Sequence, residues 1–203
     1  GELDSPDFII LGEKEVMFAI VAKSACSSIK TSICGTPPEG VKIHQHTSHL
    51  SHRRIPQKKG QYFVFTIVRD PYERLASCYR AKFNREDEST FIFSNYLFGY
   101  LKNHDSFDEF VRKVSKIPDK ISDRHFRSQH KIVFASGNKV DFIGKFENLS
   151  SDFEGIRTKY GFGELPVLNK SSGRSAADLF SDETREAASR RYKKDFELFG
   201  YSN

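Results

Sequence analysis

Cysteine is scarce in this chain of 203 residues, which contains only Cys26, Cys34 and Cys78. An odd and sparse set of this kind argues against a disulfide framework and favours a reducing compartment. Zinc sites that are built on cysteine pairs need a CxxC spacing, and the sequence has none. With 37% hydrophobic residues, the chain is long enough to form one globular domain, residues 1–203, with a core of its own.

Long hydrophobic runs, internal repeats and low-complexity tracts are absent as well. The longest apolar runs, at residues 16–22 and 63–68, have the length of a β-strand. A membrane-spanning helix needs about 20 consecutive apolar residues, so we expect no membrane segment in this chain. No secretory signal is recognisable near Gly1, which fits a cytoplasmic protein or a domain whose upstream anchor has been removed.

The charge balance is basic, with 32 lysines and arginines against 27 acidic residues, a net charge of +5 and an isoelectric point near 9.0. A basic surface fits an anionic ligand, which includes nucleotides, acidic glycans, nucleic acids and membranes. Charge alone does not choose among these ligands, so the choice depends on local motifs.

Alternating strand-like and helix-like segments predict an α/β protein. We expect strands at residues 8–11, 16–22, 62–68, 131–135 and 141–146. We expect helices at residues 27–33, 71–83, 91–101, 151–160 and 182–196, and another that starts after residue 106. Strands separated by helices favour a central, mostly parallel sheet flanked by helices, in which ligands bind beyond the carboxyl ends of the strands.

Several of the expected helices carry start signals. Pro71 suits the first turn of a helix because its missing N–H would have no partner there. Ser106 with Glu109, and Ser151 with Glu154, match the capping-box pattern in which each side chain bonds to the backbone of the other.

The segment 23–28, KSACSS, follows the strand at 16–22 and precedes a helix. Backbone N–H groups at a helix start, the helix dipole and serine hydroxyls form a cradle for an anion, and Lys23 adds a mobile charge. The segment therefore predicts a phosphate site. It is not the P-loop of kinases, GxxxxGK[ST], because no glycine lies between Val16 and Cys34. A serine N-cap beside an exposed lysine is the alternative.

The strand at 62–68 ends in a second polar sequence, RDPYERLAS, with Arg69 at the strand end. Arg74 and Ser77 follow on the expected helix and share one face of it, since they are three residues apart. Arg69 and Ser77 could converge on one anion if the turn between strand and helix folds back. The alternative is structural, with Asp70 capping the helix and pairing with Arg74.

Four segments resemble the sulfotransferases that use 3′-phosphoadenosine-5′-phosphosulfate, and they are most similar to the carbohydrate branch of that family. KSACSS resembles the 5′-phosphosulfate loop. VRDPYERLASCYRAKF, residues 68–83, is close to the 3′-phosphate motif RDPxxRxxSxYxxKF. DFIGKFENL, residues 141–149, and DFELFGY, residues 195–201, resemble two further family segments. The resemblance implies a single P-loop-like α/β domain over residues 1–203.

The same resemblance implies roles for individual residues. Lys23 would contact the oxygen that bridges sulfate and phosphate, and Arg69 with Ser77 would hold the 3′-phosphate. The residues that would cradle the 5′-phosphosulfate are Ser24, Ala25, Cys26, Ser27 and Ser28. The loop at 169–174, which includes Lys170, would close over the nucleotide. Since these groups neutralise the donor, we expect no metal.

Four of the seven histidines lie in the segment 42–54. An acceptor hydroxyl benefits from a base that works near neutral pH, for which histidine or glutamate is suited. Heparan 2-O-sulfotransferases carry an HxH pair shortly before the RDP strand, and the comparable pair here is His44 and His46. We predict His46 as the base, with His44 as the second choice.

Other interpretations of this cluster stay open. His46, His49 and His52 are spaced three residues apart and could bind a metal from one helix face. The segment could also be a basic polar loop without a catalytic role. Glu73, or a glutamate at 86–88, is another candidate base.

DRHFRSQ, residues 123–129, resembles a family segment that lines the acceptor cleft, so His125 and Arg127 are predicted to contact substrate; surface charge on a helix is the alternative. Glycosylation sequons at Asn148 and Asn169 are interpreted as accidental. The chain has no tryptophan, so any stacking on sugars would fall to its tyrosines and phenylalanines.

We therefore predict a sulfotransferase that moves a sulfuryl group from 3′-phosphoadenosine-5′-phosphosulfate to a hydroxyl of a carbohydrate, expected to be acidic. No nucleic acid partner is expected, and the oligomeric state is left open. A bacterial cytoplasmic enzyme is favoured, with the Golgi lumen as the alternative for a trimmed domain. Two functions compete with this prediction. A nucleotide-dependent kinase would reveal itself by magnesium dependence. A non-catalytic module that binds polyanions would reveal itself by salt-sensitive polyanion binding.

Overall fold

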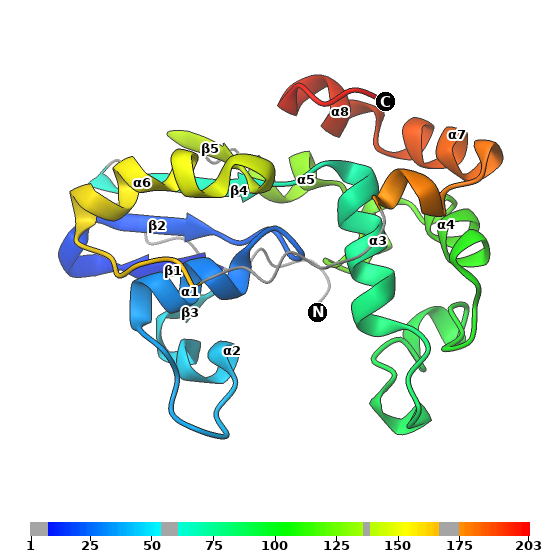
Figure 1. Cartoon of the computed structure of the whole chain (residues 1–203), viewed down its shortest axis with the longest axis horizontal. Coiled ribbons are helices and arrows are strands. Elements are labelled where there is room, and N and C mark those ends of the chain that lie inside the picture. Colours follow the sequence, from blue (N-terminus) through cyan, green and yellow to red (C-terminus); the bar gives the residue numbers. More distant parts are fainter. Residues whose placement is uncertain (1–7, 54–60, 136–138, 167–174) are drawn as a thin grey trace. The chain divides into compact units, whose positions relative to one another are not determined.

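The computed structural model describes residues 8–53, 61–135, 139–166 and 175–203 (Figure 1). The chain divides into two compact units. The sheet unit comprises Gly1–Arg69 and Gln129–Ser172, and the helical unit comprises Asp70–Ser128 and Gly173–Asn203. Among the described residues, no helix is long and apolar enough to span a membrane. A single catalytic domain over residues 1–203 stays a prediction.

The sheet unit has strands, α-helices and short 3₁₀ turns. Its strands are β1 (Phe8–Leu11), β2 (Val16–Ala19), β3 (Ser51–His52), β4 (Phe63–Val68) and β5 (Phe142–Lys145). Its α-helices are α1 (Cys26–Cys34), α2 (Ile43–His46), α5 (Gln129–Val133) and α6 (Leu149–Tyr160). Its 3₁₀ turns are η1 (Gly12–Lys14), η2 (Ser48–Leu50) and η8 (Phe146–Asn148).

The strands lie in the order β3-β1-β2-β4-β5. β1 pairs antiparallel with β2 and β3, whereas β4 pairs parallel with β2 and β5 (Figure 1). The parallel centre with its flanking helices confirms the predicted α/β class, although the hairpin at β1 makes the sheet as a whole mixed. The register places Ala19 beside Thr66 and Val68 beside Lys145, so the parallel strands end at one edge, where sheets of this type bind ligands.

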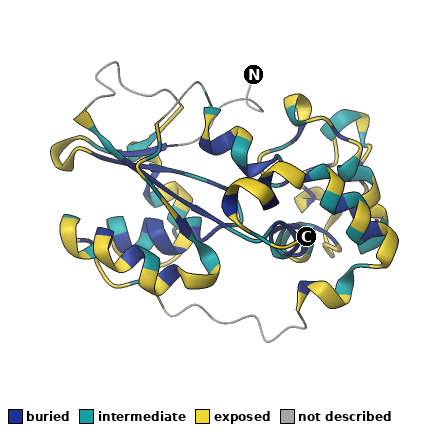
Figure 2. Ribbon diagram, turned by 90° about the horizontal axis from the view of Figure 1, so that it is seen from above, coloured by how far each residue is buried: buried dark blue, intermediate teal, exposed yellow. Residues whose placement is uncertain are grey.

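Alternate strand residues face two separate apolar clusters, as the period of two of a β-strand requires. One cluster joins Phe18 and Phe65 of the strands to Ile29 of α1 and Phe153 of α6, so both helices cover the same face. The rings of Phe18 and Phe65 stack with their centroids 5.0 Å apart. The opposite face carries a smaller cluster that includes Met17. The buried strands are dark blue in Figure 2, and β4 is buried from its second residue onward, as its apolar sequence predicted.

The helical unit consists of helices and 3₁₀ turns within the described residues. Its α-helices are α3 (Pro71–Lys82), α4 (Phe107–Ser115), α7 (Asp182–Arg191) and α8 (Lys193–Phe199). Its 3₁₀ turns are η4 (Glu88–Thr90), η5 (Tyr96–Phe98), η6 (Asp119–Ile121) and η9 (Ala176–Leu179). The capping box of Ser106 and Glu109 is confirmed, with bonds of 3.2 and 2.8 Å, and Pro71 opens α3 as predicted.

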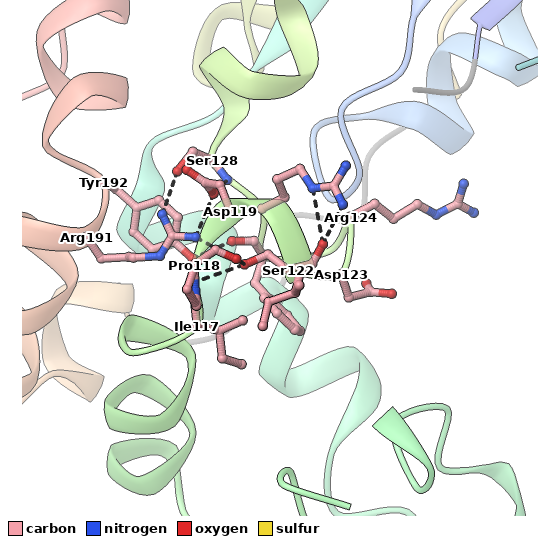
Figure 3. A network of polar contacts seen from close by, with 12 residues as sticks. Ile117, Pro118, Asp119, Ser122, Asp123, Arg124, Ser128, Arg191 and Tyr192 are labelled. Carbon is pink, nitrogen blue, oxygen red and sulfur yellow. Dashed lines mark hydrogen bonds and ion pairs between the residues drawn. The ribbon is translucent and has the colours of Figure 1, made fainter. Parts of the chain in front are cut away.

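Polar contacts of Arg191 tie α7 to the segment 117–128 (Figure 3). Arg191 Nη2 donates to Asp119 Oδ1 at 2.6 Å and to Ser122 Oγ at 3.1 Å, while Nη1 donates to Ser128 Oγ at 2.8 Å. Burial opposes the ionisation of Asp119, but the hydrogen bonds that it accepts from Arg191 and from the Ser128 N–H, together with the Arg191 charge, lower its pKa below the usual range. The pair therefore stays ionised and holds this segment in place.

The predicted helix at residues 91–101 is wrong. Turns and the short η5 occupy this stretch, and Leu97 and Phe98 have left-handed φ angles of 46° and 56°. Phe93 is buried whereas Phe98 is fully exposed, so the apolar residues do not follow the period of a helix. Phe91, Phe93 and Leu101 enter the core of the helical unit separately, without a shared helix face.

The predicted strand at residues 131–135 is also wrong, because α5 occupies most of this stretch. A short apolar run fits a buried helix as well as a strand, and periodicity cannot separate the two. Ile132 and Val133 are buried on α5, and Gln129 at its start contacts the backbone of Arg69. The helix α5 therefore starts at a residue, Gln129, whose side chain makes a tertiary contact.

The predicted capping box at Ser151 is wrong, although the helix that it was meant to open exists. α6 begins earlier, at Leu149, and Ser151 Oγ donates to the carbonyl of Asn148 at 3.0 Å. Glu154 pairs with Arg157 at 2.7 Å and is not engaged with the serine. Ser151 therefore lies inside the helix, where it cannot act as the N-cap.

The predicted helix at residues 182–196 is two helices that meet at Tyr192. The residue has φ −108° and ψ 19°, outside the helical region, and only 1% of its surface is exposed. Its hydroxyl donates to the carbonyl of Phe126 at 2.6 Å. A buried hydroxyl needs such a partner, and the break in the helix coincides with this contact.

Candidate active site

The loop between β2 and α1 has an unusual backbone. Lys23 and Ala25 have left-handed φ angles of 69° and 60°. This conformation costs a non-glycine residue about 1–2 kcal/mol and occurs mainly where function or packing demands it. The carbonyl of Val21 accepts from the Ser24 N–H at 3.2 Å and from Cys26 Sγ at 3.1 Å. The KSACSS sequence therefore turns sharply just before the helix.

Helix α1 begins at Cys26, directly after this turn. The first N–H groups of an α-helix have no intrahelical partner and carry the positive end of the helix dipole. Ser27 is exposed, whereas Ser24 and Ser28 are buried. The first turn can thus offer an anion its N–H groups and the Ser27 hydroxyl, while Ser24 supports the loop from within.

Arg69, which follows β4, contacts the segment that follows β2, so the two polar segments noted in the sequence lie together. Nη1 of Arg69 donates to the carbonyl oxygen of Lys23 at 3.2 Å. Its guanidinium carbon lies 4.0 Å from the centroid of the Phe146 ring. A cation–π contact of this kind is worth about 0.5–2 kcal/mol. The positive charge of Arg69 is therefore held beside the loop that precedes α1.

Two residues that hold Arg69 were missed by the sequence interpretation. Phe146 lies in the segment 141–149, which was noted only for its resemblance. Gln129 is fully buried, and its side-chain amide bonds to the backbone N–H and carbonyl of Arg69 at 2.9 and 2.7 Å. Gln129 ends the segment 123–129, which was likewise noted only for its resemblance, and the roles predicted there were given to His125 and Arg127.

The remaining predicted nucleotide contacts are not tested by this geometry. Ser77 is half-buried on α3 and belongs to the helical unit, whereas Arg69 belongs to the sheet unit. Their shared role at a 3′-phosphate stays a prediction. Lys170 and the loop at 169–174 lie outside the described residues.

His44 and His46 differ in their ring contacts. Lys30 Nζ lies 3.2 Å from His44 Nδ1, and burial lowers the pKa of Lys30. With Lys30 as the donor, Nδ1 of His44 accepts and its Nε2 carries the proton of the neutral ring. His46 Nε2 lies 3.4 Å from the carbonyl oxygen of Cys34, which can only accept. Nε2 of His46 is therefore the protonated nitrogen, and its Nδ1 keeps the lone pair.

The structure contradicts the interpretation of the histidine cluster as a metal site on one helix face. His46 ends α2, His49 lies in η2 and His52 lies in β3. Within the described ranges, no group of three or more His, Cys, Asp and Glu side chains could hold a metal ion. Donor binding without a metal stays a prediction.

The alternative glutamate bases have structural contacts in the helical unit. The carboxylate of Glu73 accepts from the Ala176 N–H at 3.0 Å. Glu88 pairs with the ring of His104 at 2.6 Å. These contacts favour structural roles and leave the histidines of α2 as the better candidates.

Asp123 orients His125 in the helical unit. Its Oδ1 accepts from the backbone N–H of His125 at 2.9 Å and lies 2.6 Å from ring Nδ1. Burial lowers the pKa of His125, and the hydrogen bond to Asp123 opposes this effect in part. With Nδ1–H directed at the carboxylate, the neutral ring has its lone pair on Nε2.

Arg127 and Arg74 stabilise the segment that contains His125 through hydrogen bonds to its backbone. Nε and Nη2 of Arg127 donate to the carbonyl of Ser122 at 3.1 and 2.8 Å. The buried Arg74 donates to the carbonyls of Arg127 and Arg124 at 2.7 and 2.8 Å. Arg74 therefore has a structural role here, and the predicted substrate contacts of His125 and Arg127 stay predictions.

Comparison with known proteins identifies one family and several relatives with related names. The family model described as "Sulfotransferase family" matches residues 6–202. No solved structure gives a significant match.

Curated relatives carry the same kind of name. Carbohydrate sulfotransferase 10 of Xenopus laevis is 27% identical over 90% of this chain and 59% of its own length. Carbohydrate sulfotransferase 14 of Danio rerio is 26% identical over 95% and 61%. Carbohydrate sulfotransferase 12 of Mus musculus is 24% identical over 78% and 48%. The chain thus spans about half to three fifths of the length of these relatives.

Proposed function

The chain belongs to the sulfotransferase family, and on that premise we propose that it transfers a sulfuryl group from 3′-phosphoadenosine-5′-phosphosulfate to a hydroxyl of a carbohydrate. The observation that carries the proposal is the contact of Arg69 Nη1 with the Lys23 carbonyl at 3.2 Å. This contact holds a guanidinium beside the turn that opens α1, so that two groups suited to phosphates lie together. The names of the relatives support the carbohydrate acceptor.

The reaction resembles phosphoryl transfer, with in-line attack and catalysis mainly through positioning and charge stabilisation. The acceptor oxygen forms a bond to sulfur while the bond from sulfur to the bridging phosphate oxygen breaks. 3′-Phosphoadenosine-5′-phosphate leaves with the electron pair of that bond. Lys23 and the first N–H groups of α1 stabilise the negative charge that grows on the leaving phosphate.

His46 takes the proton of the acceptor hydroxyl in this scheme. Its Nε2 is directed at the Cys34 carbonyl, so Nδ1 is the nitrogen with a lone pair. His44 has the opposite arrangement, because its Nδ1 already accepts from Lys30. These contacts support His46, and not His44, as the base of the proposed reaction.

The donor is held through its two phosphate groups. Lys23 and the segment 24–28 form the site of the 5′-phosphosulfate, with the first N–H groups of α1 and the exposed Ser27 hydroxyl as the contacts and the buried Ser24 as support for the loop. Arg69 contacts the 3′-phosphate, with Ser77 as its predicted partner. The acceptor is expected to be acidic because the chain carries a net charge of +5. The cellular compartment, bacterial cytoplasm or Golgi lumen, stays a prediction.

Calorimetric titration with 3′-phosphoadenosine-5′-phosphate, without added metal, tests the proposal. Wild type should bind, and Arg69→Ala should bind about 10- to 100-fold more weakly, the loss expected for a hydrogen-bonded charge. Lys139→Ala is the control, because its side chain is 89% exposed and precedes β5, at the opposite end of the parallel strands. It removes the same charge and should leave the affinity unchanged.

The outcomes separate the competing functions. If wild type does not bind 3′-phosphoadenosine-5′-phosphate, the proposal is wrong. Salt-sensitive binding of heparin in its place would identify a polyanion-binding module. Magnesium-dependent transfer from ATP would identify a kinase. If wild type binds and Arg69→Ala binds more weakly, the activity is measured directly. The assay follows the transfer of labelled sulfate from the donor to a panel of acidic polysaccharides.

A further inference from the structure

Gln129 is fully buried although its side chain is polar. Its Oε1 accepts from the Arg69 N–H at 2.9 Å, and its Nε2 donates to the Arg69 carbonyl at 2.7 Å. One amide thus pairs with both backbone groups of a single residue, as a neighbouring strand would. Since β4 ends at Val68, this pair extends the hydrogen bonding one residue beyond the strand.

The same amide also contacts the loop that precedes α1. The Ser24 hydroxyl donates to Gln129 Oε1 at 3.5 Å, and both residues have no exposed surface. Ser24 lies between Lys23 and Ala25, the two residues with left-handed backbone. One buried side chain therefore contacts the segment after β2 and the segment after β4 together.

The position of the Arg69 guanidinium depends on the backbone that Gln129 holds. The guanidinium contacts the Phe146 ring at 4.0 Å and the Lys23 carbonyl at 3.2 Å. A rotation of the Arg69 backbone would carry the charge away from both partners. Displacements of about 1 Å at a binding group are enough to lose most of its effect on the ligand.

We infer that Gln129 is a positioning residue of the nucleotide site, which fixes Arg69 and the segment 23–28 before the ligand binds. The inference rests on the proposed function, in which Arg69 holds the 3′-phosphate. Gln129 then acts selectively: it strengthens the binding of nucleotides with a 3′-phosphate and has little effect on nucleotides without one. A glutamine with a structural role alone would change stability without this selectivity.

Gln129→Met tests the inference, because methionine keeps the length of the side chain and removes its hydrogen bonds. The measured quantity is the ratio of affinities for 3′-phosphoadenosine-5′-phosphate and adenosine 5′-monophosphate, obtained by calorimetry. We expect this ratio to fall about tenfold or more, toward that of Arg69→Ala. The matched control is Thr66→Val, which removes a buried hydrogen bond of 2.7 Å to the Ala19 carbonyl in the same sheet. It should lower the melting temperature and leave the ratio unchanged.

Gln129→Glu supplies a second test that does not depend on the folding of the methionine variant. A protonated carboxyl donates and accepts as an amide does, and burial raises the pKa of a carboxyl group. At about pH 5.5 the ratio, relative to wild type at the same pH, should recover, and at about pH 8 it should fall.

Each outcome decides the inference. Folded Gln129 variants that keep the wild-type ratio at both pH values would overturn it and leave the proposed function intact. Wild type that does not prefer the bisphosphate would overturn the proposed function and the inference together. A ratio that is lost in Gln129→Met and restored by acid in Gln129→Glu would establish Gln129 as the positioning residue.

Discussion

Lys30 Nζ lies 3.2 Å from Nδ1 of His44, and with Lys30 as the donor the lone pair of that nitrogen is engaged within the protein. Burial lowers the pKa of Lys30, so this lysine does not behave as an ordinary surface charge. His46, two residues on, directs Nε2 at a carbonyl and keeps Nδ1 as an acceptor. The two histidines are close in sequence and differ in which ring nitrogen is engaged within the protein.

His46→Ala should lower kcat by about 10²- to 10⁴-fold, the usual contribution of a positioned general base. The affinity for 3′-phosphoadenosine-5′-phosphate should change little, because in the proposed mechanism His46 acts on the acceptor. His44→Ala should have a smaller effect on kcat. Steady-state kinetics with a sulfated-product readout measure both variants. The reverse pattern, with His44→Ala inactive and His46→Ala active, would move the base by two residues.

Lys23→Ala should lower kcat by about 10²- to 10³-fold, because in the proposed mechanism Lys23 stabilises charge that develops on the leaving phosphate. The left-handed backbone at Lys23 is tolerated equally by alanine, so the loop should keep its form. Lys23→Arg should recover part of the rate. Single-turnover transfer measures the chemical step, and Lys139→Ala is the charge-matched control. A wild-type rate in Lys23→Ala would exclude the assigned role.

His125 should make the stability of the helical unit depend on pH. Burial lowers its pKa in the folded state, whereas in the unfolded chain it takes up a proton below about pH 6.5. Between these two pKa values the unfolded state binds more protons, so the free energy of unfolding decreases as the pH falls. His125→Gln removes this titration and should flatten the dependence below about pH 6.5.

Urea unfolding at several pH values from about 5 to 8 measures this effect, since the titration of histidine falls in that range. The control is His104→Gln, because the side chain of His104 is 74% exposed in the same unit. We expect the control to keep the wild-type slope. Equal slopes for wild type and His125→Gln would show that the burial of His125 has no energetic consequence.

The strand ends were predictable because their residues carry physical signals. The apolar run at 62–68 is too continuous for a surface strand, and a charged residue directly after it, Arg69, must lie at the edge of the sheet. Lys23 and the serines that follow it give the same signal at a second strand. The pairing of these two segments follows from the parallel register of β2 and β4, which the sequence implies only through the fold class.

The contacts that complete the site could not be predicted because they join residues distant in sequence. Gln129 contacts Arg69 across 60 positions of sequence, and the resemblance of its segment, 123–129, does not indicate this contact. The helix prediction at 91–101 failed for a related reason, since the buried residues of this stretch, such as Phe91 and Phe93, are placed by the core of the helical unit and not by a helical period. Local patterns thus locate the donor groups, and tertiary contacts decide how they are held.

Arg191 should contribute more to stability than its neighbour on α7. Arg191→Met should cost about 3 kcal/mol, because it leaves the Asp119 carboxylate, 20% exposed, without its guanidinium partner. Arg190→Met is the matched control, since Arg190 is 74% exposed, pairs with Glu186 at 3.5 Å, and should cost less than about 1 kcal/mol. Adding Asp119→Leu to Arg191→Met should recover much of the loss, because the unpaired charge is then gone. Urea unfolding near neutral pH measures all three variants. Equal losses for Arg191→Met and Arg190→Met would mean that the half-buried pair of Arg191 and Asp119 does not hold segment 117–128 to α7.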